Sequence, residues 1–365
     1  MSSPKKNMQY VRLGNSGLKV SRVILGTMSY GSPEWQKWVL DEEEGIKHIK
    51  LAYEMGIQTF DTANAYSNGL SEVVLGKAIK QLNLPRDEIV VMTKVYFQVG
   101  HRINEFTMGG GGPPNEHGLS RKHIFDSIKR SLERLQLDYV DVLQCHRFDY
   151  NTPIAETMQA LHDVVKAGYA RYIGMSSCYA YQFQAMQNYA ITNNLTPFIS
   201  MQNHYNLVYR EEEREMMPTL KIDLGKMFGV GSIPWSPLAR GFLTRPLDQQ
   251  QTTRGQTDRQ AHEGNSEIVR RVESLAKKKN LTMAQVALAW VMSKDQVSAP
   301  IVGTTNIKNL EELIGKQLFT LEFISNTYTL HSTSCCECEI GRRRDQAPRR
   351  ALCTTSYLWT LMIHG

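Results

Sequence analysis

Four side chains of the sequence could together protonate a carbonyl oxygen. They are Asp61, Tyr66, Lys94 and His146, and each ends or follows a short apolar run. A phenol such as Tyr66 has a pKa of about 10 and is a poor acid at neutral pH. A neighbouring ammonium favours the phenolate, so Lys94 would lower that pKa, and Asp61 would neutralise and orient the ammonium.

These groups suit the reduction of an aldehyde or ketone. Tyr66 would give its proton to the carbonyl oxygen as a general acid while a hydride reaches the carbon, and His146 would position the oxygen. No side chain supplies hydride, so a bound cofactor must supply it. Taken singly, each residue is more often a cap, a solvated end or a packed core group. Taken together on three consecutive strands, they predict catalysis.

Alternating strand and helix patterns must bring these residues together. Eight short apolar runs alternate with helical patterns after a hairpin pattern at 10–20; the expected strands are 23–26, 57–61, 89–93, 139–143, 172–175, 198–201, 231–235 and 299–302. Eight such units in about 300 residues favour an α/β fold of the (β/α)8 TIM-barrel type. An open doubly wound sheet would want a Gly-x-Gly-x-x-Gly after an early strand, and the sequence has none. In a barrel the carboxyl ends of successive strands share one face, where the four side chains would meet.

Composition argues against several other classes of protein. The net charge is +6, but no basic run is long enough to form a nucleic-acid-binding stripe. No segment approaches the ~18–20 apolar residues of a membrane span, and Met1 to Met8 does not resemble a secretory signal. The six cysteines form neither a spaced disulfide framework nor the paired spacing of a zinc site. We therefore expect a cytoplasmic protein with no nucleic-acid partner, no membrane association and no metal; its oligomeric state is not predicted.

Three motifs resemble the signatures of the aldo-keto reductase superfamily in order and spacing. They are Asp61-Thr-Ala-Asn-Ala-Tyr66-Ser-Asn-Gly69-Leu-Ser-Glu72, Thr93-Lys94 and Asp141-Val-Leu-Gln-Cys-His146. Segments 232–241 and 300–305 resemble more narrowly the fungal and bacterial branch that includes aryl-alcohol dehydrogenases and versiconal hemiacetal acetate reductase. The resemblance runs from the hairpin to about residue 315. It implies a (β/α)8 barrel that reduces aldehydes or ketones with NADPH, and a place in secondary metabolism.

The resemblance also implies where NADPH would bind. It assigns the nicotinamide carboxamide to Ser176, Ser177 and Gln202, the nicotinamide ring to Trp235, the pyrophosphate to Ser236, Leu238, Arg240 and Gly241, the 2′-phosphate region to Gly303, Thr304, Thr305 and Lys308, and adenine to Glu312. A flat apolar face at Trp235 would decide which side of the ring delivers hydride, and core packing is the alternative role. Asn309 stands where many members have Arg, and Leu313 where many have Asn. Lys308 would then supply the cation, without the fork of an Arg.

Aromatic residues after the first, third and fourth strands are the candidate substrate pocket. The candidate substrate-binding residues are Tyr30, Trp35, Trp38, Tyr96, Phe97, Arg147 and Phe148. They would suit an aromatic or polyketide-like aldehyde or ketone, although such a wall can also be mere packing. Two alternatives to an active reductase stay open. One is a nicotinamide-binding regulatory subunit resembling potassium-channel beta subunits, and the other is an enzyme weakened by an altered C-terminus.

Two regions depart from the family pattern. Residues 222–226 look like an insert that would disturb a helix, because Gly225 lies within it. After residue 315 the family normally continues with a segment that folds over the substrate pocket, and the sequence here is unlike it. We therefore predict a barrel domain at 8–315 and an atypical tail at 316–365. The tail is interpreted as either poorly ordered or the product of a misread gene model.

Overall fold

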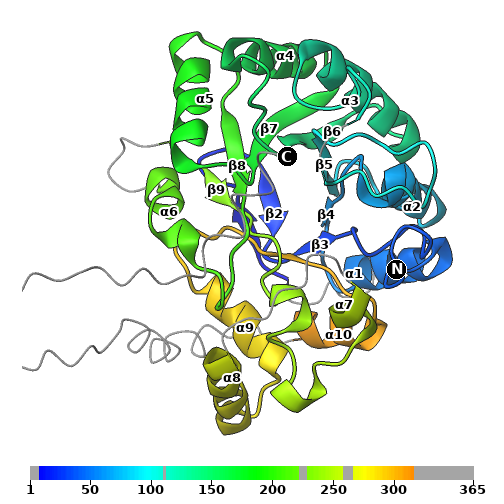
Figure 1. Cartoon of the computed structure of the whole chain (residues 1–365), viewed down its shortest axis with the longest axis vertical. Coiled ribbons are helices and arrows are strands. Elements are labelled where there is room, and N and C mark those ends of the chain that lie inside the picture. Colours follow the sequence, from blue (N-terminus) through cyan, green and yellow to red (C-terminus); the bar gives the residue numbers. More distant parts are fainter. Residues whose placement is uncertain (1–7, 110–111, 222–227, 258–265, 316–365) are drawn as a thin grey trace, which may run out of the picture. The chain divides into compact units, whose positions relative to one another are not determined.

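A computed structural model describes residues 8–109, 112–221, 228–257 and 266–315 (Figure 1). The predicted insert at 222–226 and the predicted tail at 316–365 lie outside the described residues. The boundary placed at 315 and the interpretation of the tail therefore stay predictions. No helix in the described part of the chain is long and apolar enough to cross a membrane.

Eight parallel strands in the described part of the chain form a barrel. In chain order they are β3 (Ile24–Gly26), β4 (Thr59–Asp61), β5 (Val90–Val95), β6 (Val140–Cys145), β7 (Ala170–Ser176), β8 (Phe198–Gln202), β9 (Gly231–Ser232) and β10 (Ile301–Val302). Strands that follow one another in the chain pair with one another, and β10 pairs with β3. The ring closes between its last two strands, where Ile301 N donates to Pro234 O at 2.9 Å and Ser298 N donates to Ser232 O at 2.8 Å. The predicted (β/α)8 fold is confirmed.

Helices between the strands cover the outer face of the barrel (Figure 1). They are α1 (Glu42–Glu54), α2 (Leu70–Gln81), α3 (Arg121–Leu135), α4 (Ile154–Lys166), α5 (Ala180–Thr192), α6 (Met216–Leu220), α8 (Ser266–Lys279), α9 (Met283–Met292) and α10 (Ile307–Ile314). Asp41 begins α1 because its carboxylate accepts from Glu44 N, and the Ser120 hydroxyl caps α3 by accepting from His123 N. Each cap satisfies a backbone donor that the first turn would leave unpaired.

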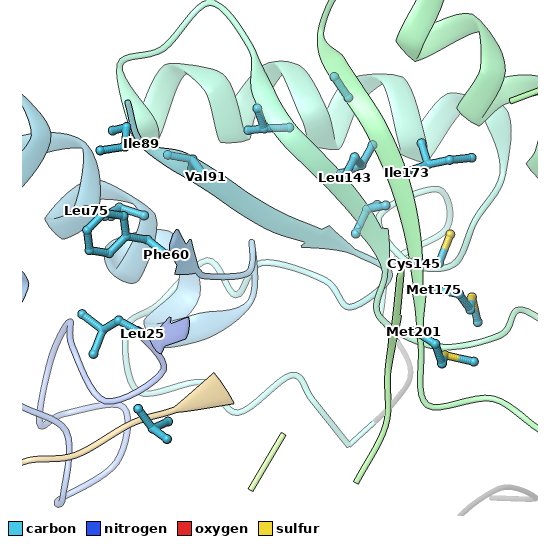
Figure 2. Packing of buried hydrophobic residues seen from close by; sticks show 14 of the residues in the cluster. Leu25, Phe60, Leu75, Ile89, Val91, Leu143, Cys145, Ile173, Met175 and Met201 are labelled. Carbon is cyan, nitrogen blue, oxygen red and sulfur yellow. The ribbon is translucent and has the colours of Figure 1, made fainter. Parts of the chain in front are cut away.

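Alternation along the strands separates an apolar outer layer from the barrel interior. Phe60, Val91, Leu143 and Ile173 belong to one buried cluster with residues of the surrounding helices (Figure 2). Side chains next to them in sequence point the other way, into the barrel. Lys94 and the other polar residues of the site occupy such inward positions near the carboxyl ends of the strands.

A hairpin closes the amino end of the barrel. Its strands β1 (Tyr10–Arg12) and β2 (Lys19–Ser21) are antiparallel, as the sequence predicts. Leu13 and Val20 are fully buried and join a cluster with Met92 from the barrel interior. Apolar packing therefore fills the amino end of the barrel.

Some elements differ from the sequence prediction. The strands expected at 231–235 and 299–302 have only two regular residues each, because Pro234 and Pro300 cannot donate to a ladder. The chain from Glu211 forms a short 3-10 turn, η2 (Glu211–Glu213), followed by α6. The polar stretch after Leu243 contains two short elements, η4 (Leu247–Gln249) and α7 (Thr253–Thr257), while 258–265 lie outside the described residues.

Candidate active site

Lys94 lies at the centre of the site and is fully buried. Its Nζ donates to Asp61 Oδ2 at 2.5 Å, to Thr62 O at 2.8 Å and to Tyr66 Oη at 3.3 Å. An ammonium has three donors, so each of them has a partner. The pairing of β4 with β5 places Asp61 beside Met92, which lies two residues before Lys94 on the same face of β5. The structure therefore brings together the Asp61, Tyr66 and Lys94 that the sequence placed on neighbouring strands.

The second oxygen of Asp61 is held by two amides. Gln144 Nε2 and Gln202 Nε2 each donate to Asp61 Oδ1 at 2.9 Å, and Gln202 Nε2 also donates to Gln144 Oε1 at 2.8 Å. Gln202 was expected at the nicotinamide carboxamide, and here its amide nitrogen faces Asp61. Sequence reasoning missed Gln144. The period of two in β6 could have found it, since Val142, Gln144 and His146 alternate with the outward residues.

The protonation of Tyr66 follows from its burial. Burial raises the pKa of the Tyr66 phenol above its ordinary value, and the Lys94 ammonium opposes that rise without cancelling it. The expected lowering of this pKa is therefore wrong as a net direction, because desolvation of the phenolate outweighs the attraction of Lys94. Burial alone would lower the pKa of Lys94, but the Asp61 carboxylate and the Tyr66 hydroxyl together outweigh it, and the pKa is raised. The site thus holds a neutral phenol beside an ammonium, the state that a general acid needs.

His146 lies beside the phenol as a neutral imidazole. Its ring centroid is 5.7 Å from that of Tyr66, edge to face, and 5.0 Å from that of Phe97. Burial, with the neighbouring charges of Arg147 and Lys94, holds the pKa of His146 well below its ordinary value. Its Nδ1 is buried and has no hydrogen-bond partner among the described residues. A neutral imidazole there can hydrogen-bond an uncharged oxygen held next to Tyr66.

A cavity of about 630 Å³ opens over these groups, within the size range of small-molecule sites. Of the predicted catalytic and cofactor residues, its lining includes Asp61, Tyr66, His146, Ser176, Gln202, Trp235, Ser236, Leu238, Arg240, Gly241, Gly303, Thr304, Thr305 and Glu312. Ser177 lies just behind this wall, where its Oγ accepts from Trp235 Nε1 at 3.2 Å. Lys308 does not line the cavity, although the neighbouring Asn309 does.

Only two of the predicted substrate-binding residues line the cavity, Trp38 and Arg147. The other five do not line it and pack against other rings: Tyr30 on His48, Trp35 on Phe106, Tyr96 on His117, Phe97 on His146 and Phe148 on Tyr150. Tyr30 is fully buried. Sequence position alone could not separate these cases, because neighbouring residues of a turn point in different directions.

Positive charge dominates the cavity wall. Its cationic residues are Lys37, Arg147, Arg240, Arg245 and Arg254, and its only carboxylates among the described residues are Asp61 and Glu312. Lys37, Arg245 and Arg254 were missed by sequence reasoning, because the polar loops that carry them have no periodic pattern. An anionic dinucleotide fits this wall, and Trp235 adds a flat aromatic side chain to it. The residues present therefore fit a nicotinamide dinucleotide.

Comparison with known proteins adds a separate line of evidence. The model of the aldo/keto reductase family matches residues 22–325. Versiconal hemiacetal acetate reductase of Aspergillus parasiticus is 50% identical over 321 residues, which cover 84% of this chain and 92% of that protein. An aldo-keto reductase of Fusarium vanettenii is 46% identical over 339 residues, covering 87% of this chain and 90% of the relative. A further aldo-keto reductase, from Metarhizium robertsii, is 43% identical over 339 residues with the same coverage.

Proposed function

The chain belongs to the aldo/keto reductase family, and we propose that it reduces an aromatic or polyketide-like aldehyde or ketone to the alcohol with NADPH. One observation carries the proposal. Lys94 Nζ bonds both Asp61 and Tyr66, and the Tyr66 phenol faces a cavity that His146 also lines. No structural role requires these groups to converge on an open cavity.

The proton transfer follows from the geometry. NADPH would supply the hydride when bound. Tyr66 Oη would give its proton to the carbonyl oxygen, and the phenolate left behind would be stabilised by the Lys94 ammonium. Asp61 balances the charge of Lys94, so the ammonium does not give up its own proton. His146 would hold the carbonyl oxygen close to the phenol.

Several cavity residues would hold the cofactor. Trp235, Ser176 and Gln202 would surround the nicotinamide, and Arg240 and the residues next to it would contact the phosphates. NADPH carries one more phosphate than NADH, and the excess of cations over carboxylates in the wall favours the more negative cofactor. We therefore propose NADPH as the preferred donor, with Thr304 and Thr305 near the 2′-phosphate.

The substrate class is proposed from the apolar residues of the wall. Trp38, Met28 and Met108 offer apolar surface, which suits a flat ring system. Arg147 also lines the cavity and makes no ion pair with a carboxylate of the described residues. An oxygen-rich aromatic substrate would give this guanidinium acceptors. The name of the relative in Aspergillus parasiticus refers to a hemiacetal acetate, which supports an oxygen-rich substrate.

One assay tests the proposal against the alternative of a nicotinamide-binding regulatory subunit. NADPH absorbance is followed with a reactive aromatic aldehyde, for the wild type and for Tyr66→Phe. We expect turnover by the wild type, and its loss in the variant with NADPH binding retained. Tight NADPH binding without turnover of any of a panel of aldehydes would overturn the enzyme and favour a nicotinamide-sensing subunit. Repeating the assay with NADH tests the cofactor preference; a higher kcat/KM with NADH would reverse it.

A further inference from the structure

We propose that Ser67 and Asn68, the two residues after Tyr66, are positioning residues for two loops of the cavity wall, one after β3 and one after β5. By fixing these loops they would set the preference for bulky substrates. The proposal rests on the proposed function for its substrate readout and on the structure alone for the loop contacts. Both residues have left-handed backbone, with φ of 46° and 48°. Non-glycine residues rarely adopt this conformation, and a run of two persists only where the surroundings hold it.

Asn68 binds the loop that follows β5. Its Nδ2 donates to Arg102 O at 2.9 Å, to Ile103 O at 3.2 Å and to Glu105 O at 2.8 Å, and its Oδ1 accepts from Gly100 N at 3.0 Å. One amide therefore engages four backbone groups within six residues of this loop. The approach is close, because a Cβ on Gly100 would lie 2.7 Å from Asn68 Nδ2.

Ser67 meets the loop that follows β3. It is fully buried, and its Oγ accepts from Ser32 N at 3.4 Å. Gly31 has a φ of 152° and passes so close that a Cβ there would collide with the Ser67 side chain. The loop after β3 therefore packs against Ser67, just as the loop after β5 is held by Asn68. The left-handed turn sends two adjacent side chains to two loops that are far apart in sequence.

The two loops supply the apolar wall beside the phenol. Trp35 and Trp38 come from the first loop, and Phe106 and Met108 from the second. All four belong to one cluster with Tyr66, and the rings of Trp35 and Phe106 are 5.8 Å apart. Trp38 and Met108 line the cavity, whereas Ser67 and Asn68 do not. The two residues after Tyr66 can therefore influence a substrate only through the loops they hold.

The decisive variant is Asn68→Gly. Glycine adopts the left-handed backbone without cost, so the substitution removes the amide but keeps the turn after Tyr66. We expect KM for a bulky aromatic aldehyde to rise about tenfold, the equivalent of one lost hydrogen bond of ~1.4 kcal/mol. The kcat for a small aldehyde and the affinity for NADPH should stay within twofold. Asn68→Asp should behave alike, because a carboxylate cannot donate to the three carbonyls.

Asn83→Gly is the matched control. Asn83 is another left-handed asparagine, with φ of 50°, and it follows α2 on the exposed surface without a side-chain hydrogen bond among the described residues. Its replacement should leave the kinetics of reduction unchanged for both the small and the bulky aldehyde.

Hydrogen exchange provides a readout that does not depend on catalysis. Asn68→Gly should speed exchange at the amide of Gly100 and its neighbours, and leave strands β5 and β6 protected. Unchanged exchange in this loop would overturn the proposal, and so would an equal loss of activity with the small and the bulky aldehyde. If the wild type reduced no aldehyde, the proposed function would fail, while faster exchange in the variant would still show that Asn68 holds the loop.

Discussion

Gln144 Nε2 donates to Asp61 Oδ1 at 2.9 Å, although the two residues are 83 positions apart in the chain. The buried bond joins β4 to β6, and it leaves Asp61 Oδ2 to Lys94. Each oxygen of the carboxylate therefore has its own task. One holds the ammonium, and the other fixes the carboxylate to β6.

Gln144→Met should slow the reaction without weakening cofactor binding. Methionine has a similar length but cannot donate, so Asp61 would lose one of the two amides that orient it. A hydrogen bond to a charged group is worth about 1.5–3 kcal/mol, so kcat should fall roughly tenfold or more. Steady-state kinetics and an NADPH titration measure the two effects. Gln159→Met, which removes an exposed amide bonded to Asp163, is the control and should change neither; an equal loss in both variants would contradict the role of Gln144.

Asp61→Asn should damage both rate and stability. The amide cannot balance the charge of Lys94, which is fully buried. Breaking one side of a buried ion pair costs about 3–5 kcal/mol in the free energy of unfolding. Urea denaturation measures that loss, and stopped-flow kinetics with bound NADPH measures the slower proton transfer. A variant with normal kcat would show that Lys94 does not need Asp61 for its effect on Tyr66.

The pH dependence of reduction should lack an inflection in the ordinary range of histidine. Burial holds the pKa of His146 well below its ordinary value, so the ring is already neutral throughout the pH range in which an ordinary histidine titrates. Burial also raises the pKa of Tyr66, so the phenol keeps its proton until the pH is strongly alkaline. The kcat for reduction should therefore be flat near neutrality and fall only at high pH. An inflection near pH 6.5 that disappears in His146→Gln would contradict the neutral imidazole.

Glu212→Gln should stabilise the fold at alkaline pH. Burial raises the pKa of the Glu212 carboxyl to about 7, and the neighbouring Glu211 adds to the rise. Between the unfolded value near 4.5 and about 7 the folded state binds more protons, so the wild type loses stability as the pH rises through this window. Glutamine removes that cost and keeps an acceptor for Asn203, the partner of Glu212.

At pH 8 the variant should therefore unfold at a higher temperature than the wild type, with a free energy of unfolding larger by on the order of 1 kcal/mol. At pH 4.5 the two proteins should differ little. Thermal unfolding at the two pH values tests this. An equal gain at both would mean that the charge of Glu212 is not the cause. Asn203 Oδ1 also accepts from Ser177 N. The titrating Glu212 carboxyl is therefore linked by two hydrogen bonds to Ser177, which is expected at the nicotinamide site.

The sequence by itself determined the fold and the set of candidate catalytic residues. Alternating strand and helix patterns predicted the barrel, and the positions of Asp61, Lys94 and His146 at the ends of consecutive strands predicted that they meet. These predictions were possible because the position of a residue at a strand end and the two-residue alternation of side chains are local properties of the sequence. The barrel repeats both around one axis. The family motifs carried the same residues.

Only the tertiary structure decided how those residues are held. Contacts between distant parts of the chain decide three features. They are the partner of Gln202, the direction of the Tyr66 pKa shift, and the contacts of two loops with Ser67 and Asn68. The same holds for the aromatic residues: Trp38 reaches the cavity and Tyr30 does not, although both follow the same strand. Burial and side-chain direction are set by what packs from other strands and loops, and that information is absent from any one segment.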